Sequence, residues 1–227
     1  MLVVLSIVSI LSILVSAGFQ SILGSVEDGQ VSDIASTLTR ARAYAMANNT
    51  YVFVGIQEVS AANASNATQT AGTGRIAMTV VASSDGTRGY QTSISASTPL
   101  SSLNVVSPVR HYDNLHLLTS AGTGISNLPN SNTTTSTTYE AASSASLTTF
   151  SASPQYPTFG GSGASNDTII QFNPQGQAQI VTGPYTDSVL QWIEIDLSPT
   201  HGTTVSGKNP ATILIDGASG SVTTYRE

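Results

Sequence analysis

The stretch VSDIASTLTRARAYAMANNTYVFVGI, residues 31–56, changes its hydrophobic period from that of a helix to that of a strand. In its first part, apolar residues recur at spacings of three and four, which places them on one helical face: Val31, Ile34, Ala35, Leu38, Ala41 and Ala45. Strong helix formers fill residues 40–47, and Asn48-Asn49 offers a stop. The pattern predicts an amphipathic helix over about 32–48, packed on the rest of the chain through Ile34, Leu38, Ala41 and Ala45.

Before this helix lies an apolar run, MLVVLSIVSILSILVSAGF, with no charged residue between Met1 and Val26. As a helix, nineteen residues at about 1.5 Å each span about 28 Å, close to the hydrocarbon thickness of a bilayer. The run predicts a transmembrane or filament-core helix. The residues expected to carry membrane insertion and assembly are Leu2, Val3, Val4, Leu5, Ser6, Ile7, Ser9, Ile10, Leu11, Ser12, Leu14 and Ser16. The serines among them form one helical stripe, which lets apolar helices approach closely.

An export signal that is later removed is the alternative interpretation of the same run. Val15-Ser16-Ala17 resembles a cleavage site, but a signal peptide needs a basic segment before its apolar core, and here only Met1 precedes Leu2.

After Thr50 the pattern favours strands. Residues 51–56 and 76–81 are rich in β-forming side chains, and two hairpins are predicted, around the turn Asn173-Pro174-Gln175-Gly176 and around 216–220. In residues 192–197 apolar side chains alternate with Glu194 and Asp196, which predicts a strand with one face in water. Residues 119–166, rich in Ser, Thr, Gly and Asn, are expected to form a long surface insertion.

These segments predict an α+β protein. Its parts are an apolar transmembrane or filament-core helix over 1–26, an amphipathic helix over 27–49, and a β-rich head over 50–227 with the 119–166 insertion. The long helix is expected to pack on one antiparallel sheet of the head.

Composition excludes several classes of function. The chain has 227 residues, no cysteine and only 9% charged residues, with a net charge of −6. Thiol chemistry and cysteine-ligated metals are therefore ruled out, and a basic face for nucleic acid is not expected. The 34 serines and 29 threonines suggest an exported, hydroxyl-covered surface.

The residues Leu2-Val3-Val4-Leu5-Ser6-Ile7-Val8-Ser9-Ile10-Leu11 resemble the start of mature type IV pilins and type II secretion pseudopilins, the segment known as the prepilin N-terminal methylation motif. Three later segments are similar to H-type minor pseudopilins: residues 38–49 followed by a strand, the Phe172–Gly176 turn, and the terminal hairpin from Ile213 to Asp216. The resemblance implies a long N-terminal helix that carries a globular head, with the apolar helix halves bundled in the core of a helical filament.

The chain departs from that pattern at its first residue. When Leu2-Val3-Val4 is aligned with the family, Met1 stands just after the position of the family's glutamate, so the leader and the first mature residues are missing. We expect the sequence to be a shortened version of a longer product. The alternative is a subunit that lacks the glutamate, which in the family is thought to neutralise a neighbour's N-terminal amine.

Motifs of catalysis are absent from the sequence, and we expect neither enzymatic activity nor a cofactor nor a metal. His111, Asp113 and His116 are the one cluster that merits a test as a metal site, but their spacing suits neither a helix face nor one strand face. The loop from Asp216 to Gly220 could offer oxygens to calcium, yet it lacks the repeated acids of a calcium loop, so a plain turn is expected.

Three functions remain open. The first is a structural subunit of a type IV pilus-like filament or secretion pseudopilus, anchored in the inner membrane before assembly and then part of a periplasmic or extracellular filament. Its partners would be its own copies or other pilin-like subunits, the inner-membrane assembly machinery, and membrane lipid. The second is a DNA-uptake minor pilin, disfavoured because the last hundred residues contain only Lys208 and Arg226 as fixed positive charges. The third is a membrane-anchored surface module that binds glycans through Trp192, Tyr156 and Tyr185.

Overall fold

A computed structural model describes residues 28–64, 72–86, 103–118, 138–140, 169–180, 192–205 and 209–226, with the backbone alone for 138–140 and Ile180. Within these ranges a helix covers residues 28–48 and strands follow it. The strands are β1 (Val52–Ser60), β2 (Gly74–Ser83), β3 (Leu103–Asp113), β4 (Leu115–Leu117), β5 (Thr138–Glu140), β6 (Ile169–Phe172), β7 (Ala178–Ile180), β8 (Trp192–His201), β9 (Thr204–Val205), β10 (Ala211–Asp216) and β11 (Val222–Arg226).

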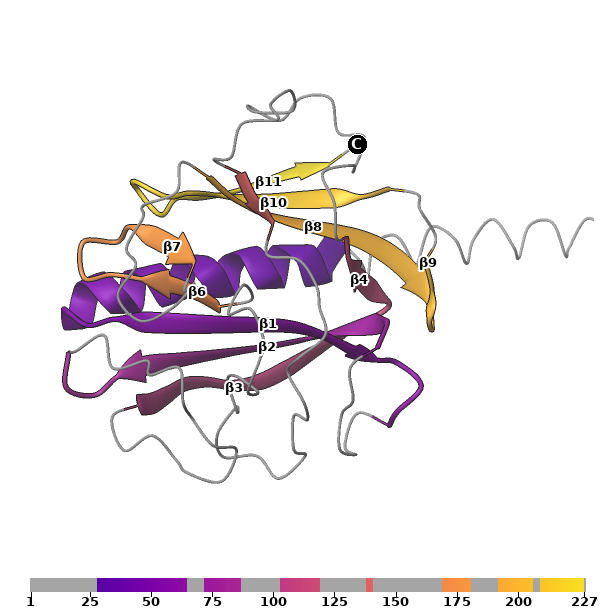
Figure 1. Ribbon diagram of the computed structural model, residues 1–227, viewed down its shortest axis with the longest axis horizontal. Helices are drawn as coiled ribbons and strands as arrows, with labels where there is room; N and C mark the ends of the chain where they lie inside the picture. The colour runs from indigo at the N-terminus through magenta and orange to yellow at the C-terminus, as the bar shows by residue number, and fades with distance from the viewer. Residues whose placement is uncertain are drawn as a thin grey trace, which may run out of the picture.

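The strands form two sheets (Figure 1). The first has the order β3-β2-β1-β6-β7, and all neighbours are antiparallel. The second has the order β11-β10-β8-β4, again antiparallel, while the short strand β5 lies parallel to β8 and β9 forms a hairpin with β8. Both predicted hairpins are confirmed, as β6–β7 and β10–β11.

Asn114 links the two sheets at a corner. It lies between β3 and β4 with φ of 63°, a left-handed conformation that asparagine tolerates better than most residues. Its N–H donates to the Gly74 carbonyl in the first sheet, and its carbonyl accepts the Thr200 N–H in the second. Asn114 therefore turns the chain while its backbone N–H is hydrogen-bonded to one sheet and its carbonyl to the other.

The C-terminal end of the helix has a Schellman cap. Asn49 has φ of 49°, and the Thr50 N–H donates to the Ala45 carbonyl at 3.1 Å. The Thr50 hydroxyl then donates to the Ser83 carbonyl at the end of β2, at 2.7 Å. The cap thus fixes the turn from helix to β1 against the neighbouring strand.

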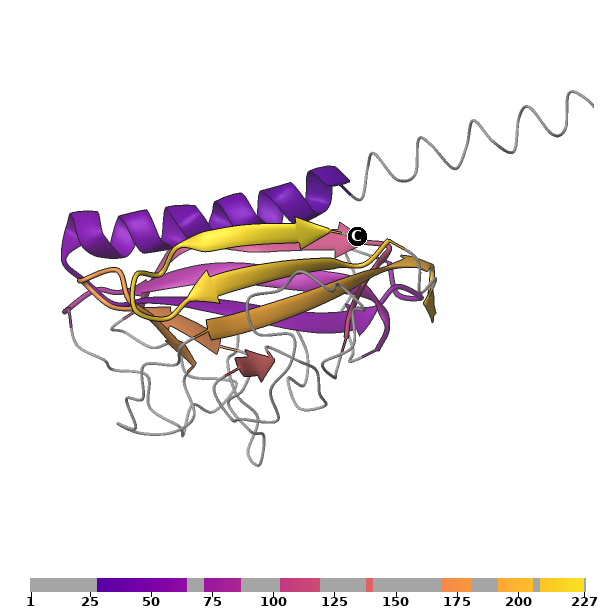
Figure 2. The same cartoon turned by 90° about the horizontal axis from the view of Figure 1, so that it is seen from above.

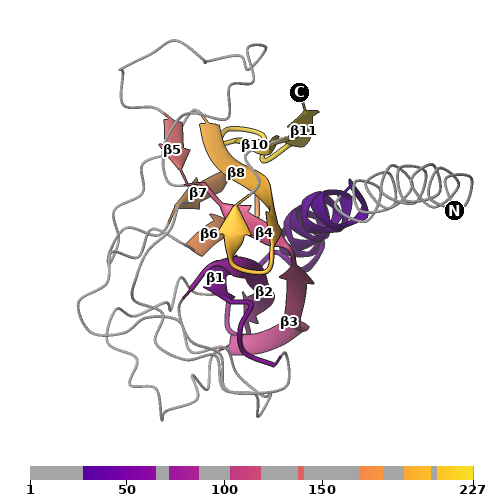
Figure 3. The ribbon, with the colours of Figure 1, turned by 90° about the vertical axis from the view of Figure 1, so that its right-hand side faces the viewer.

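A single main core lies between the helix and the inner faces of both sheets. Seen along the helix, the two sheets lie above and below and the helix lies beside them (Figure 3). The core contains residues from every second position of β1 and β8, such as Val54, Ile56, Ile193 and Ile195, as period-two alternation requires.

The predicted fold class is wrong in its proportions and its layout. Within the described ranges the protein is mostly strand, with one helix of modest length and two sheets instead of one. The second sheet arises because the chain bends at Asn114 and because β8, β10 and β11 pair among themselves.

An apolar transmembrane helix is also not among the elements of the described residues. In the part of the chain that the structure describes, no helix is both long and apolar enough to cross a membrane. The helix over 28–48 carries four charged residues, Asp28, Asp33, Arg40 and Arg42. The apolar run over 1–26 lies outside the described residues, as does all of the 119–166 insertion except β5.

Candidate assembly interface

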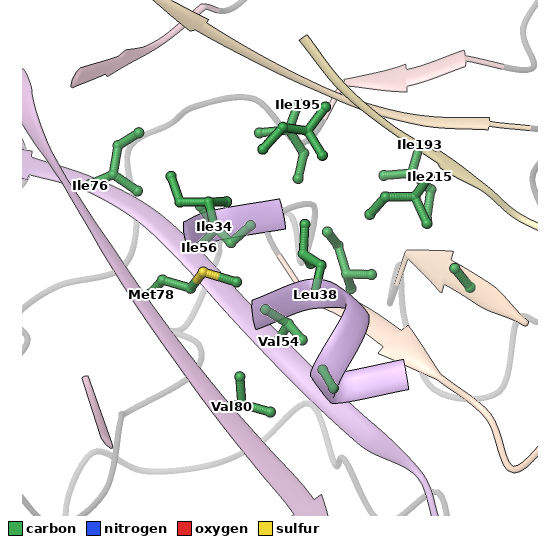
Figure 4. Packing of buried hydrophobic residues seen from close by; sticks show 14 of the residues in the cluster. Ile34, Leu38, Val54, Ile56, Ile76, Met78, Val80, Ile193, Ile195 and Ile215 are labelled. Atoms are coloured by element: carbon green, nitrogen blue, oxygen red, sulfur yellow. The ribbon is translucent and has the colours of Figure 1, made fainter. Parts of the chain in front are cut away.

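The buried face of the helix contains the four residues for which the sequence predicted packing on the head. Ile34, Leu38, Ala41 and Ala45 are each at most 2% exposed and belong to the main core. Figure 4 shows Ile34 and Leu38 among side chains that come from β1, β2, β8 and β10. The helix therefore contacts both sheets and not only one.

Asp33 joins the first half of the helix to β3, the edge strand of the first sheet. Its Oδ2 atom accepts hydrogen bonds from Arg110 Nη1 at 2.9 Å and from the Tyr112 hydroxyl at 2.8 Å, and Arg40 Nη2 lies 3.6 Å from Oδ1. Tyr112 is itself a core residue. The aspartate thus connects the exposed rim of the helix with the interior.

The same contacts change the pKa values of Asp33, Tyr112 and Arg110, and the Arg110 pKa is raised by the hydrogen bond and charge of Asp33. Burial raises the pKa of the Asp33 carboxyl, but the hydrogen bonds from Tyr112 and Arg110 and the charges of Arg110 and Arg40 outweigh burial and bring it below the ordinary value. Burial and the neighbouring Asp33 raise the pKa of the Tyr112 phenol. The lowered pKa of Asp33 and the raised pKa of Tyr112 mean that the site favours the charged carboxylate and the neutral phenol.

Two further contacts hold the other side of the helix. At its start, Asp28 forms an ion pair with Arg226 of β11, the edge strand of the second sheet, and the helix runs beside β11 (Figure 2). Farther along, Arg42 Nε donates to the Gly176 carbonyl in the β6–β7 turn at 3.3 Å. Gly220 of the β10–β11 turn fits closely against that carbonyl, because an added Cβ would lie 2.0 Å from its oxygen.

The outward face of the helix divides into two parts. Its first half exposes polar side chains such as Ser32, Ser36 and Arg40. Its last turns expose Tyr44 and Met46, which are 37% and 40% exposed and are two of the four large apolar side chains on the surface of the described chain. Tyr44 and Met46 define the apolar end of the helix; because they are two positions apart they lie on different sides of it, flanking the buried Ala45, so each would contact another protein separately.

The candidate metal cluster is not brought together. Asp113 pairs with Arg75, and His116 Nδ1 lies 2.8 Å from both carboxylate oxygens of Glu58, across the two sheets. Burial lowers the pKa of His111, and its Nε2 atom is buried with no hydrogen-bond partner among the described residues. The described side chains contain no group of three or more His, Asp or Glu residues that could hold a metal.

The loop from Asp216 to Gly220 is a turn closed by its own residues. The Asp216 carboxylate accepts the Ser219 N–H at 2.6 Å, and the Asp216 carbonyl accepts the Gly220 N–H at the same distance. Of the residues proposed for glycan binding, Trp192 is partly buried at the start of β8, while Tyr156 and Tyr185 lie outside the described residues. The predicted assembly residues between Leu2 and Ser16 also lie outside them.

Sequence reasoning missed the polar residues that hold the helix in place. Arg110 and Tyr112 are two positions apart, so they share one face of a strand, and that spacing was the available signal. Nothing in the sequence indicated that Asp33, almost eighty positions earlier, would face them.

Comparison with protein-family models, with characterised proteins and with solved structures found no match.

Proposed function

We propose that the chain is a structural, non-catalytic subunit of a type IV pilus-like filament or a type II secretion pseudopilus. The observation that carries the proposal is the way the chain continues from the charge-free segment over 1–26 into a helix that is anchored to both sheets. A subunit that assembles through an apolar N-terminal segment needs this connection, because the segment must carry the head at a fixed position.

The partners in this proposal are other copies of the chain or related pilin-like subunits. The apolar N-terminal segments would pack together in the filament core, and the apolar end of the helix, Tyr44 and Met46, would contact a neighbouring subunit. Before assembly the segment would reside in the inner membrane, and the filament would then extend into the periplasm or outside the cell. The similarity of residues 2–11 to mature pilins supports the same assignment.

The test is assembly of an Ile10→Asp variant of the full chain. A charge in an apolar bundle or in mid-bilayer costs several kcal/mol, so the variant should yield no filaments in sheared surface material viewed by electron microscopy. Ile10→Val, which changes volume by one methylene, is the matched control and should assemble normally. Circular dichroism of both variants checks that the head still folds. Normal filaments from Ile10→Asp would contradict the proposal.

A second measurement uses the absence of cysteine from the chain. In a Tyr44→Cys variant the single thiol should react with a maleimide in detergent-dispersed subunits and be protected in filaments. Equal reactivity in subunits and in filaments would show that the apolar end of the helix does not lie in the interface.

A further inference from the structure

Arg42 differs from the other arginines that the structure describes. Each of the others forms an ion pair with an aspartate, and they are Arg40, Arg75, Arg110 and Arg226. No carboxylate among the described residues lies within 4.0 Å of the nitrogens of Arg42. The chain has 13 acidic residues and only 7 lysines and arginines, so an arginine without an acidic partner is unexpected.

The side chain of Arg42 is held in one orientation. Its Nε atom donates to the Gly176 carbonyl at 3.3 Å, and an added Cβ at Gly220 would lie 3.0 Å from the Arg42 Cδ atom. Asp216, in the same turn as Gly220, accepts the Ser219 N–H and does not pair with Arg42. A guanidinium that is already fixed loses little side-chain entropy on binding, and its terminal nitrogens suit a bidentate contact with a carboxylate.

The surface around Arg42 lies at one end of the head. Met46 is 40% exposed and follows Arg42 by four positions, so both lie on one side of the helix. An added Cβ at Gly176 would lie 2.7 Å from the Met46 sulfur, so the β6–β7 turn adjoins both side chains (Figure 1). This surface, the arginine end, is defined by Arg42, Met46 and Gly176. Arginine and methionine are both enriched in protein–protein interfaces.

The opposite end of the head exposes carboxylates. Asp28, the first residue of the helix, has a side chain that is 64% exposed, and its Oδ1 atom pairs with Arg226. Its Oδ2 atom has no partner among the described residues. Asp113, 50% exposed, lies at the end of β3, and Arg110 and Tyr112 of this strand contact the first half of the helix. Asp28 and Asp113 define the acidic end of the head, where the helix begins (Figure 2).

We propose that the arginine end of one copy of the chain binds the acidic end of a second copy, through an ion pair between Arg42 and Asp28. Within one copy these residues lie about 21 Å apart along the helix axis, at 1.5 Å per residue, so they do not pair with each other. The two surfaces differ, which makes the contact heterologous, and such a contact can repeat from copy to copy along a filament. The inference rests on the proposed function, because it assigns a contact between neighbouring heads.

A charge swap in the full chain tests the pair. Arg42→Asp and Asp28→Arg should each lower the yield of sheared filaments at least tenfold, because each places like charges at the contact. The double variant restores opposite charges and should return the yield to within threefold of the parent chain. That recovery would also exclude damage to the head by the single changes.

Arg40→Asp combined with Asp28→Arg is the matched control, since it has the same net charge as the double variant. Arg40 lies two positions from Arg42 and therefore faces another side of the helix. The yield of this control should stay as low as that of Asp28→Arg alone.

Cross-linking tests the contact in detergent-dispersed chain, without filaments. The chain has no cysteine, so Ser32→Cys with Ser219→Cys places one exposed thiol near each end of the head. A short bismaleimide should join this double variant into a ladder of dimers, trimers and longer products, whereas either single-thiol variant cannot extend beyond a dimer. Adding Arg42→Gln to the double-thiol variant should weaken the ladder at least tenfold.

The two tests separate this inference from the filament role. Filaments from the parent chain without a ladder, or a charge swap that restores no yield, would overturn the pairing of Arg42 with Asp28 and leave the filament role standing. A ladder that depends on Arg42 in a chain that forms no filaments would instead overturn the filament role and support the pairing. Absence of both ladder and filaments would overturn both.

Discussion

Leu38→Ala tests whether the helix is part of the core of the head. Leu38 is fully buried between the helix and the two sheets, and the substitution removes three carbon atoms. At about 0.8 kcal/mol for each buried carbon, the transfer cost is about 2.4 kcal/mol. The cavity that remains brings the expected loss of stability to about 3 kcal/mol. The folded-to-unfolded ratio should then fall by about 150-fold, since 1.4 kcal/mol is a factor of ten.

The assay is urea unfolding followed by circular dichroism, with the slope of free energy against denaturant compared between variants. An unchanged slope with a lower midpoint would identify a pure change in stability. Met46→Ala is the matched control on the same helix, because Met46 is 40% exposed and its truncation should cost less than about 1 kcal/mol. If Leu38→Ala and Met46→Ala lowered stability equally, to within about 0.5 kcal/mol, the packing of the helix against the sheets would be refuted.

Two further predictions concern the contacts around the helix. Because the folded-state pKa of Asp33 lies below its ordinary value of 3.8, its stabilising contribution should be complete above about pH 5 and be lost as the pH falls below 3.8. Thermal unfolding from pH 2 to pH 6 should therefore show the parent chain more stable than Asp33→Asn at pH 6, with this advantage shrinking as the pH falls below 3.8; an advantage that stays constant over the whole range would exclude this cause. Gly220→Ala should destabilise the head by about 2 kcal/mol or more, since its φ is +66° and the new Cβ would meet the Gly176 carbonyl oxygen. Gly86→Ala, with φ of +71° and open space around it, should cost only the backbone strain, and equal losses in urea unfolding would contradict the clash.

The helix and the two hairpins were predictable because their signals are local. A run of apolar residues at spacings of three and four specifies the helix face, and Pro174 with Gly176 specifies the β6–β7 turn. Each signal lies within about twenty residues of chain. Ile34 and Leu38 therefore point inward as their spacing predicts, and the Schellman cap begins at the expected asparagines.

The sheet layout was not predictable, because its signals are either weak or distant. β3 contains Pro108 and Arg110 and does not alternate cleanly between apolar and polar residues, so its sequence does not predict a strand. It also changes register against β2 near Val80. Both features are common in edge strands. Asn114 turns the chain into the second sheet through a left-handed backbone conformation, and the residues around it do not predict this turn. The sequence therefore predicted one sheet, whereas the structure has two.

The face of β8 that points away from the main core carries Glu194 and Asp196. The alternation of residues 192–197 predicted that this face would be in water, but both residues are buried. Alternation identifies which side chains share a face, and it did so correctly for Glu194 and Asp196. It does not say whether that face meets water, because exposure depends on what the rest of the chain places over it. Whether a polar strand face is buried is consequently a feature that the local sequence does not predict.

The contacts of the helix also bear on how a filament subunit would carry load. Asp33 binds the edge strand of one sheet through Arg110 and Tyr112, and Asp28 binds the edge strand of the other through Arg226. A force applied to the segment before residue 28 would be transmitted to the head through these two contacts together and through the buried face of the helix between them. Loss of either polar contact should leave the other intact, because they lie on different sheets. The free energies lost in Asp33→Asn and Asp28→Asn should therefore add in the double variant, as expected for sites without shared partners.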